Sequence, residues 1–466
     1  MSLSAQVLEA GIVIGEAQIA SGSASARCGS SKSCSKLEQF NDESPAIEMS
    51  PISPMDSQSN SQSDVPETAP HYLRAHIQLG ALCFFLYLEG WNDGTNGPLL
   101  PRIQKVYHVG YAVVSLIFVF ACLGFITGAL LNVSLTEKLG FGKIMVLGSL
   151  FQVVAYTIEA TAPPFPAFVF AYFLGGIGLA LQNAQSVGYV ARLKPNAETK
   201  MGFLMACYGA GALSSPIAAT HFAQVSRWSF HYLVSLGLAL FNTVLLIIVF
   251  RLKRQDECLV QIGLEPTEKG TSEHSEFRQI FGLKDVHLLA SFILFYVGAE
   301  VTIGGWIVTY VQNVRGGGPS SGYISTGFFG GLMFGRLALL WVNRKLGERL
   351  ALFIYAISAI ALELIVWLVP SLVGDAVAVA VIGILLGPMY PIAMNHAGRV
   401  LPRWLLTGSI GWIAGVGQAG SALVPFMAGA IASKSGIRTL QPVLVGILGL
   451  MTALWALVPK SSRRVD

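Results

Sequence analysis

Three carboxylates stand inside long apolar stretches of the chain: Glu89, Asp93 and Glu300. An ionised side chain at the centre of a bilayer costs about 2.5–3.5 kcal/mol on insertion scales, so such a group usually faces a partner or a cavity. Glu89 and Asp93 are four residues apart and therefore share one face of a helix. These acids could exchange a proton, hold a sodium ion or accept hydrogen bonds from ligand hydroxyls. The structural alternative is a buried pair, for which Glu89 is the best candidate.

Amide, phenol and indole groups accompany the acids in the apolar stretches. They are Asn92, Asn96, Gln182, Asn183, Gln185, Tyr390, Asn395 and Trp306. Amides and hydroxyls suit hydroxylated ligands, and the ring of Trp306 could stack on a sugar. The structural alternatives are hydrogen bonds between helices, worth about 0.6 kcal/mol on average in membrane proteins, and an interfacial anchor for Trp306.

One basic residue, Arg336, also falls inside an apolar stretch and therefore needs an anionic partner. We expect a structural or gating ion pair, with a substrate anion as the alternative. The sequence contains no HExxH or GxSxG motif and no pair of catalytic metal ligands, so we expect neither an enzyme nor a bound cofactor or metal. A coupling ion, H⁺ or Na⁺, is the only small partner expected besides a substrate. The six cysteines show no paired spacing and are expected to be free thiols.

The composition explains where these residues must sit. Hydrophobic residues make up 53% of the 466 residues and charged residues only 12%, which is too apolar for an ordinary soluble protein. A helix needs roughly 20 apolar residues to cross a bilayer. Twelve such stretches occur, near 77–98, 111–136, 143–162, 165–191, 199–223, 230–251, 286–312, 320–345, 350–370, 373–399, 403–431 and 437–459. The predicted fold class is an all-α membrane protein with twelve transmembrane helices.

Polar segments divide the chain into parts. Residues 1–72 are rich in Ser, Gln, Pro and acids, so we expect a disordered cytoplasmic tail. Residues 73–251 and 286–459 would form two six-helix bundles, joined by a cytoplasmic connector over 252–285 and followed by a short tail over 460–466. With both termini inside, 23 of the 30 Lys and Arg lie on the cytoplasmic side and 6 outside, which sets the orientation. The basic residues form no single patch, so nucleic acid is not an expected partner.

The two halves repeat each other. Lys138-Leu139-Gly140 recurs as Lys345-Leu346-Gly347, an offset of 207 residues, and the same offset relates Gly128 to Gly335. It also relates Asp93 to Glu300, so one acid would come from each half. Two six-helix halves repeated in parallel are the architecture of the major facilitator superfamily, whose helices 1, 4, 7 and 10 line a central cavity.

Two spans carry a narrower resemblance. The first runs from Phe84 through Asn92-Asp93 to Leu99-Leu100-Pro101, and it resembles the fucose permease branch of that superfamily. The seventh, Tyr296–Trp306, looks like the same helix in fungal and animal members of the branch, which include sodium-dependent glucose transporters. Bacterial fucose permeases have an Asp directly before the Leu-Leu-Pro and a Glu in the fourth span. Here Gly97, Pro98 and Gln182 or Asn183 stand there, so the family's coupling residues do not carry over.

The resemblance implies secondary active transport of a small, sugar-like solute by alternating access. Import follows from the branch, whereas export of a metabolite is the alternative, and a solute sensor that signals through its tail is an alternative of another class. The expected partners are a small-molecule substrate and the lipid bilayer, with the chain acting as a monomer. The plasma membrane is the expected location.

Overall fold

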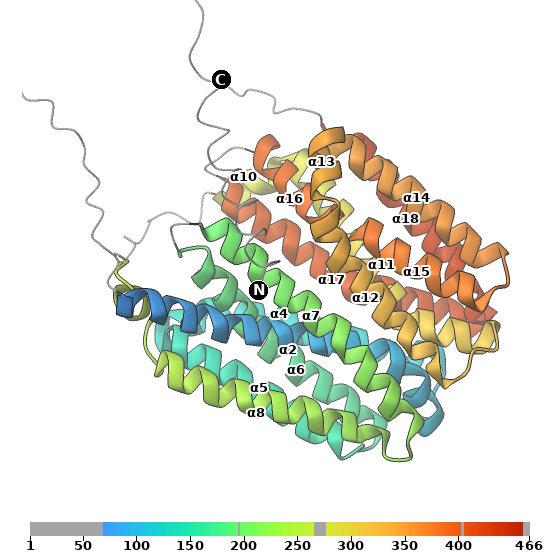
Figure 1. Ribbon diagram of the computed structural model, residues 1–466, viewed down its shortest axis with the longest axis horizontal. Coiled ribbons are helices and arrows are strands. Elements are labelled where there is room, and N and C mark those ends of the chain that lie inside the picture. The colour runs from blue at the N-terminus through green and yellow to red at the C-terminus, as the bar shows by residue number, and fades with distance from the viewer. Residues whose placement is uncertain (1–68, 194–195, 265–275, 402–404, 460–466) are drawn as a thin grey trace, which may run out of the picture. The chain divides into compact units, whose positions relative to one another are not determined.

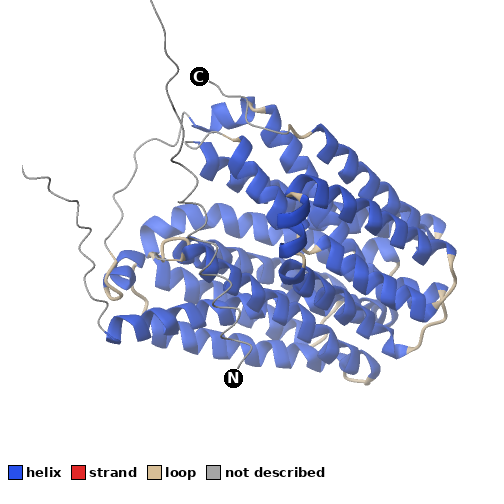
Figure 2. Ribbon diagram, turned by 45° about the horizontal axis from the view of Figure 1, so that its top comes forward, coloured by secondary structure: helices blue, strands red, loops and turns tan. Residues whose placement is uncertain are grey.

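The computed structural model describes residues 69–193, 196–264, 276–401 and 405–459. Within these ranges every regular element is a helix (Figures 1 and 2). The tail expected over 1–72, apart from its last four residues, and the tail expected over 460–466 lie outside the described residues. The first described helix begins at Ala69.

The first half holds six long helices and two short ones. They are α2 (Ala69–Tyr107), α3 (Tyr111–Val114), α4 (Leu116–Leu139), α5 (Phe141–Ala160), α6 (Phe165–Val190), α7 (Ala197–Gln224), η1 (Trp228–Phe230) and α8 (His231–Phe250). In the described part of the connector lie two short helices, α9 (Gln255–Val260) and α10 (Glu276–Gly282).

The second half follows the same plan, with two of its spans broken. Its helices are α11 (Lys284–Val314), η2 (Pro319–Gly322), α12 (Tyr323–Ala338), α13 (Leu340–Leu346), α14 (Glu348–Leu368), α15 (Leu372–Leu386), α16 (Met389–Val400), α17 (Leu406–Ser435), η4 (Ile437–Thr439) and α18 (Leu440–Leu457).

These helices form twelve membrane spans. Ten stretches of the described chain are long and apolar enough to cross a bilayer, and the bent pair formed by η2–α12 and α13 makes an eleventh. The twelfth is α2, whose hydropathy is lowered by Glu89, Asn92 and Asp93 within its 39 residues. Its Pro98 and Pro101 lie inside the helix, so α2 continues well past the predicted end of the first span near residue 98.

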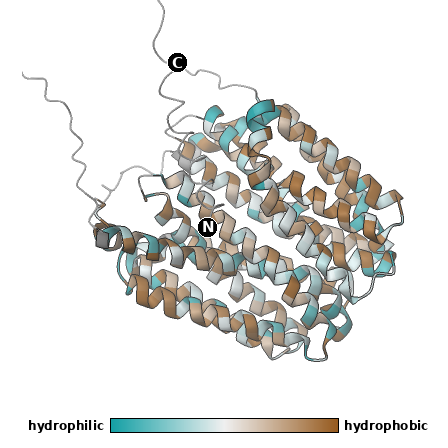
Figure 3. Cartoon of the chain, viewed as in Figure 1, coloured by the Kyte–Doolittle hydropathy of each residue, from teal (hydrophilic) through white to brown (hydrophobic). Residues whose placement is uncertain are grey.

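The outward faces of the helices are apolar. On α8, large side chains such as Leu240, Phe241, Val244 and Ile248 are exposed, and brown, hydrophobic residues follow the outer helices in Figure 3. A soluble monomer rarely exposes such a continuous apolar surface. These faces therefore fit the hydrocarbon layer of a membrane.

Close contacts between helices repeat with the offset seen in the sequence. A Cβ at Gly176 would meet Ala121 O at 2.2 Å, and one at Gly383 would meet Phe328 O at 2.2 Å; both positions are related by 207 residues. The pairs Gly124–Phe173 and Gly331–Ala380, and Gly128–Ile177 and Gly335–Ile384, repeat in the same way. Helices α4 and α6 therefore pack as α12 and α15 do, and the sequence repeat is a structural one.

Glycine also brings α2 against α7. A Cβ at Gly90 would lie 1.9 Å from Tyr208 O, and one at Gly211 would lie 1.9 Å from Tyr87 O. The second half repeats this contact between α11 and α17, where Gly420 abuts Leu294 O. Small residues let membrane helices approach this closely. This packing holds the polar face of α2 beside α7.

Candidate functional site

A polar network joins the two halves near the middle of α2. Tyr208 on α7 donates a hydrogen bond of 2.7 Å to Asp93 Oδ2. The guanidinium of Arg336 on α12 lies 5.9 Å from the centre of the Tyr208 ring, and its Nη2 lies 3.9 Å from Glu300 Oε1 on α11. Tyr208 and Arg336 therefore connect Asp93 with Glu300. Two acids, a phenol and a guanidinium from four helices are thus brought together.

The charged groups of this network are more exposed than the buried residues around them. Asp93 is exposed, although its neighbours Gly94 and Thr95 are buried. The side chains of Glu300 and Arg336 are 12% and 23% exposed. Arg336 therefore has the anionic partner that its position in an apolar helix requires, while its Nε has no hydrogen-bond partner among the described residues.

Glu89 lies one helical turn before Asp93 and faces the fourth span. Asn183 Nδ2 on α6 donates a 2.5 Å hydrogen bond to Glu89 Oε1. Glu89 is 8% exposed, and its Oε2 has no hydrogen-bond partner in the described part of the chain. One oxygen is thus fixed by an amide, and the other is left to accept a proton or a hydrogen bond.

The two asparagines of α2 bind tyrosines of the first half. Asn92 Oδ1 accepts a hydrogen bond of 3.3 Å from Tyr156, and Asn96 Oδ1 accepts one of 3.1 Å from Tyr172. The hydroxyls of Tyr172 and Tyr232 lie 3.0 Å apart. These contacts tie α2 to α5, α6 and α8, so the asparagines link helices within one half.

The two glutamines of α6 lie apart from the acids. Gln182 is fully buried and donates to the carbonyl of Met145, and it accepts a hydrogen bond from Gln152 on α5. Gln185 donates to Asn132 and Thr136 in the C-terminal half of α4. Both make the hydrogen bonds between helices that formed the structural alternative.

The candidates of the second half are distributed over three places. Trp306 is fully buried and donates its indole N–H to the carbonyl of Pro425 at 3.1 Å, and its ring packs on Tyr111 and Phe118. The ring of Tyr390 on α16 lies 6.1 Å from that of Tyr296, one turn before Glu300. Asn395 bonds to Glu348 at 3.4 Å, near the start of α14 and away from the network.

Sequence reasoning missed Tyr208, Tyr156 and Tyr172. Tyrosines are common in apolar helices, and nothing in their own neighbourhood marks them as partners of α2. A signal for Tyr208 existed in the Gly209-Ala210-Gly211 run, because Gly211 abuts the backbone of Tyr87 and so brings α7 close to α2. No group of three or more His, Cys, Asp or Glu side chains that could hold a metal ion occurs among the described residues. Cys83, Cys122, Cys207 and Cys258 are free thiols.

Comparison with known proteins is consistent with this geometry. The model of the Major Facilitator Superfamily matches residues 82–425. The chain is 26% identical over 412 residues to Bypass of stop codon protein 6 of Saccharomyces cerevisiae, with 82% of each chain covered. It is 24% identical over 375 residues to a putative glucose/galactose transporter of Helicobacter pylori, covering 76% of this chain and 89% of the relative.

Solved structures share the fold. The D-xylose-proton symporter superposes with a TM-score of 0.68 at 13% identity and covers 84% of this chain and 98% of its own. The transporter FucP in its outward conformation gives a TM-score of 0.58 at 15% identity, covering 82% and 99%. The relatives fit the branch of FucP and the glucose/galactose transporters. The family match spans most of the chain, so this protein belongs to the Major Facilitator Superfamily and is a multi-pass membrane transporter.

Proposed function

We propose that this chain is a secondary carrier in the plasma membrane that moves a sugar-like, hydroxylated solute by alternating access, as a monomer, and couples this movement to a proton or sodium gradient. The observation that carries the proposal is the network Asp93–Tyr208–Arg336–Glu300. Its members come from both halves, so rocking of the halves must rearrange it. Several of the curated relatives are named as glucose, galactose or mannose transporters, and these names support a sugar-like substrate.

The chemistry of the network suits a hydroxylated solute. Substrate hydroxyls can donate to the exposed Asp93. Glu89 Oε2 and Arg336 Nε are buried and lack partners among the described residues, so movement of the halves would have to uncover them before they could accept from or donate to the substrate. Asp93 or Glu300 would bind the coupling proton or sodium ion. Binding of a cation to one acid weakens its attraction for Arg336, and this change couples ion binding to movement of the halves.

The test is uptake and efflux of labelled hexoses, pentoses and small metabolites in proteoliposomes, with a proton or a sodium gradient imposed in turn. We expect gradient-driven uptake in the wild type and its loss in Asp93→Asn and Glu300→Gln. A matched control is Glu137→Gln, which removes an exposed acid near the C-terminal end of α4. Flux that depends on the proton gradient alone, or on the sodium gradient alone, identifies the coupling ion.

Other outcomes would overturn parts of the proposal. Outward flux of a metabolite with no sugar uptake would make the chain an exporter. Solute binding without flux under any gradient would make it a sensor, and such a sensor should need its tail. A carrier, in contrast, should still move solute after removal of residues 1–68.

A further inference from the structure

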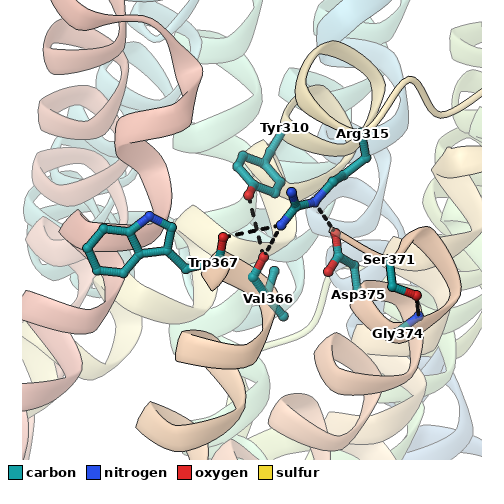
Figure 4. Close-up of polar contacts among 7 residues, drawn as sticks. All are labelled: Tyr310, Arg315, Val366, Trp367, Ser371, Gly374 and Asp375. Atoms are coloured by element: carbon teal, nitrogen blue, oxygen red, sulfur yellow. Dashed lines mark hydrogen bonds and ion pairs between the residues drawn. The ribbon is translucent and has the colours of Figure 1, made fainter. Parts of the chain in front are cut away.

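A second cluster of charged groups lies at the opposite end of α11 from the connector. Arg315, directly after α11, donates from Nε to Asp375 Oδ2 at 2.9 Å and from Nη2 to the carbonyls of Val366 and Trp367 (Figure 4). Ser371 caps the start of α15, one turn before Asp375. Arg315 therefore fastens together the ends of α11, α14 and α15. The predicted orientation places these ends on the extracellular side.

We call these contacts of Arg315 the Arg315 clamp, and they leave one nitrogen of the guanidinium, Nη1, unused. Its Nη1 makes no hydrogen bond or ion pair to a described residue, as Figure 4 also shows. The charge of Arg315 is balanced by Asp375, whose side chain is 1% exposed. The planar guanidinium is held in place by its other donors, so Nη1 is a fixed and available donor.

A cavity of about 390 Å³ opens beside Arg315. It is lined by Tyr310, Val314, Arg315, Trp367, Pro370 and Arg438. Arg438, in η4, is exposed and forms no ion pair with a described residue. Two guanidinium groups thus line one small cavity, and the lining contains no carboxylate. The buried acid Glu363 is not among the lining residues.

The predicted orientation places this cavity at the level of the lipid headgroups. Trp367 is 40% exposed at the end of α14, beside exposed Leu368 and Val369. Tryptophan is enriched at the level of the headgroups, where one side is apolar and the other wet. An anion in this cavity would therefore sit beside the first layer of the bilayer as well as beside water.

We propose that this cavity is an anion site that binds a phosphate group through Arg315 Nη1 and the side chain of Arg438. Guanidinium groups pair with phosphate oxygens through charge-assisted hydrogen bonds. Such a group can belong to an anionic phospholipid of the outer leaflet or to a soluble phosphate. In either case the bound anion adds a further contact between η4 and the Arg315 clamp, and it should stabilise the second half.

The test uses the full-length protein purified in detergent. Native mass spectrometry with added phosphatidylglycerol, and with diacylglycerol as the probe that lacks phosphate, measures lipid binding. Thermal unfolding with inorganic phosphate measures binding of the soluble anion. We expect Arg438→Gln to weaken phosphate-dependent binding by about tenfold in at least one of the two arms. Loss in the lipid arm alone identifies a headgroup, and loss in the phosphate arm alone identifies a soluble anion.

The matched control is Lys434→Gln, which removes an exposed positive charge four residues earlier, at the end of α17 and outside the cavity lining. It should leave binding within twofold of the wild type. Equal binding by the wild type and Arg438→Gln in both arms overturns the proposal. An equal loss of binding in Lys434→Gln also overturns the proposal, because the loss would then arise from the change in general surface charge. Arg438 is exposed and makes no ion pair with the described residues, so its replacement should not prevent folding.

Discussion

The residues of the site hold one another in place, as the contacts of Arg336 illustrate. Its charge inside an apolar helix is stabilised by Glu300, and its guanidinium rests over Tyr208, which in turn holds Asp93. The sequence predicted that Arg336 needs an acid and that Asp93 and Glu300 correspond by the repeat. It could not predict Tyr208, because its role depends on how closely α7 approaches α2. The roles of all these residues in transport stay predictions.

Tyr208→Phe tests the network without removing a charge. The substitution keeps the ring beneath Arg336 and deletes only the hydroxyl that donates to Asp93. A hydrogen bond to a charged group is worth about 1.5–3 kcal/mol, so we expect the transport rate to fall by about tenfold or more with little change in yield. Initial uptake rates in proteoliposomes measure the effect. Tyr323→Phe, at an exposed position on α12, is the control; equal losses in both variants would contradict the prediction.

Replacement of Glu363 on α14 is expected to stabilise the protein rather than to impair transport. It is 1% exposed, and neither of its oxygens has a hydrogen-bond partner in the described chain. A buried polar group without a partner costs about 1–3 kcal/mol, and more when it is charged. We therefore expect Glu363→Met, which fills the same space, to raise the melting temperature of the purified protein. A lower melting temperature, or loss of transport at normal yield, would reveal a role for this acid.

At the scale of helices, apolar length predicted the spans well, and their breaks only in part. The tenth span divides into α15 and α16 around Gly387 and Pro388, residues that can be recognised as a site of bending. The eighth span bends by 51° between α12 and α13, at Leu339, where no proline marks the break. The α2 helix passes through Pro98 and Pro101. Such features depend on the neighbouring helices, which a single sequence does not display.

The contact between α2 and α7 gives a prediction about packing. A Cβ at Gly90 would lie 1.9 Å from the backbone oxygen of Tyr208, and the backbone cannot move aside as a side chain can. We expect Gly90→Ala to separate the helices and to destabilise the protein by about 1–3 kcal/mol or more. The melting temperature and the yield of monodisperse protein in detergent measure this. On the same helix, Gly80 has open space around its Cβ position, so Gly80→Ala should behave as the wild type. Equal behaviour of the two variants would contradict the packing argument.

At the scale of the whole transporter, the two halves contact each other not only through the polar network but also at the ends that the predicted orientation places outside. A Cβ at Gly97 on α2 would lie 2.3 Å from Gly304 O on α11, and these two glycines are related by the repeat. Ala112 N donates to Ser433 Oγ at 2.7 Å, and Asn313 donates to the Tyr111 hydroxyl at 3.2 Å. The repeat predicted which helices correspond. It could not predict which end is closed, because both conformations of an alternating carrier use the same sequence.

A cross-link tests whether this closed end must open. Ala112 and Ser433 belong to different halves and touch through a hydrogen bond, so cysteines placed at both positions in a background without the native cysteines can be joined by a short bifunctional thiol reagent. Because a carrier that alternates access must separate these ends to admit solute from outside, we expect the cross-link to stop uptake and its cleavage to restore it. Each single-cysteine variant treated with the same reagent is the control. Undiminished uptake in fully cross-linked protein would mean that α3 and α17 move as one body, and solute would then have to enter without separating the halves at this point.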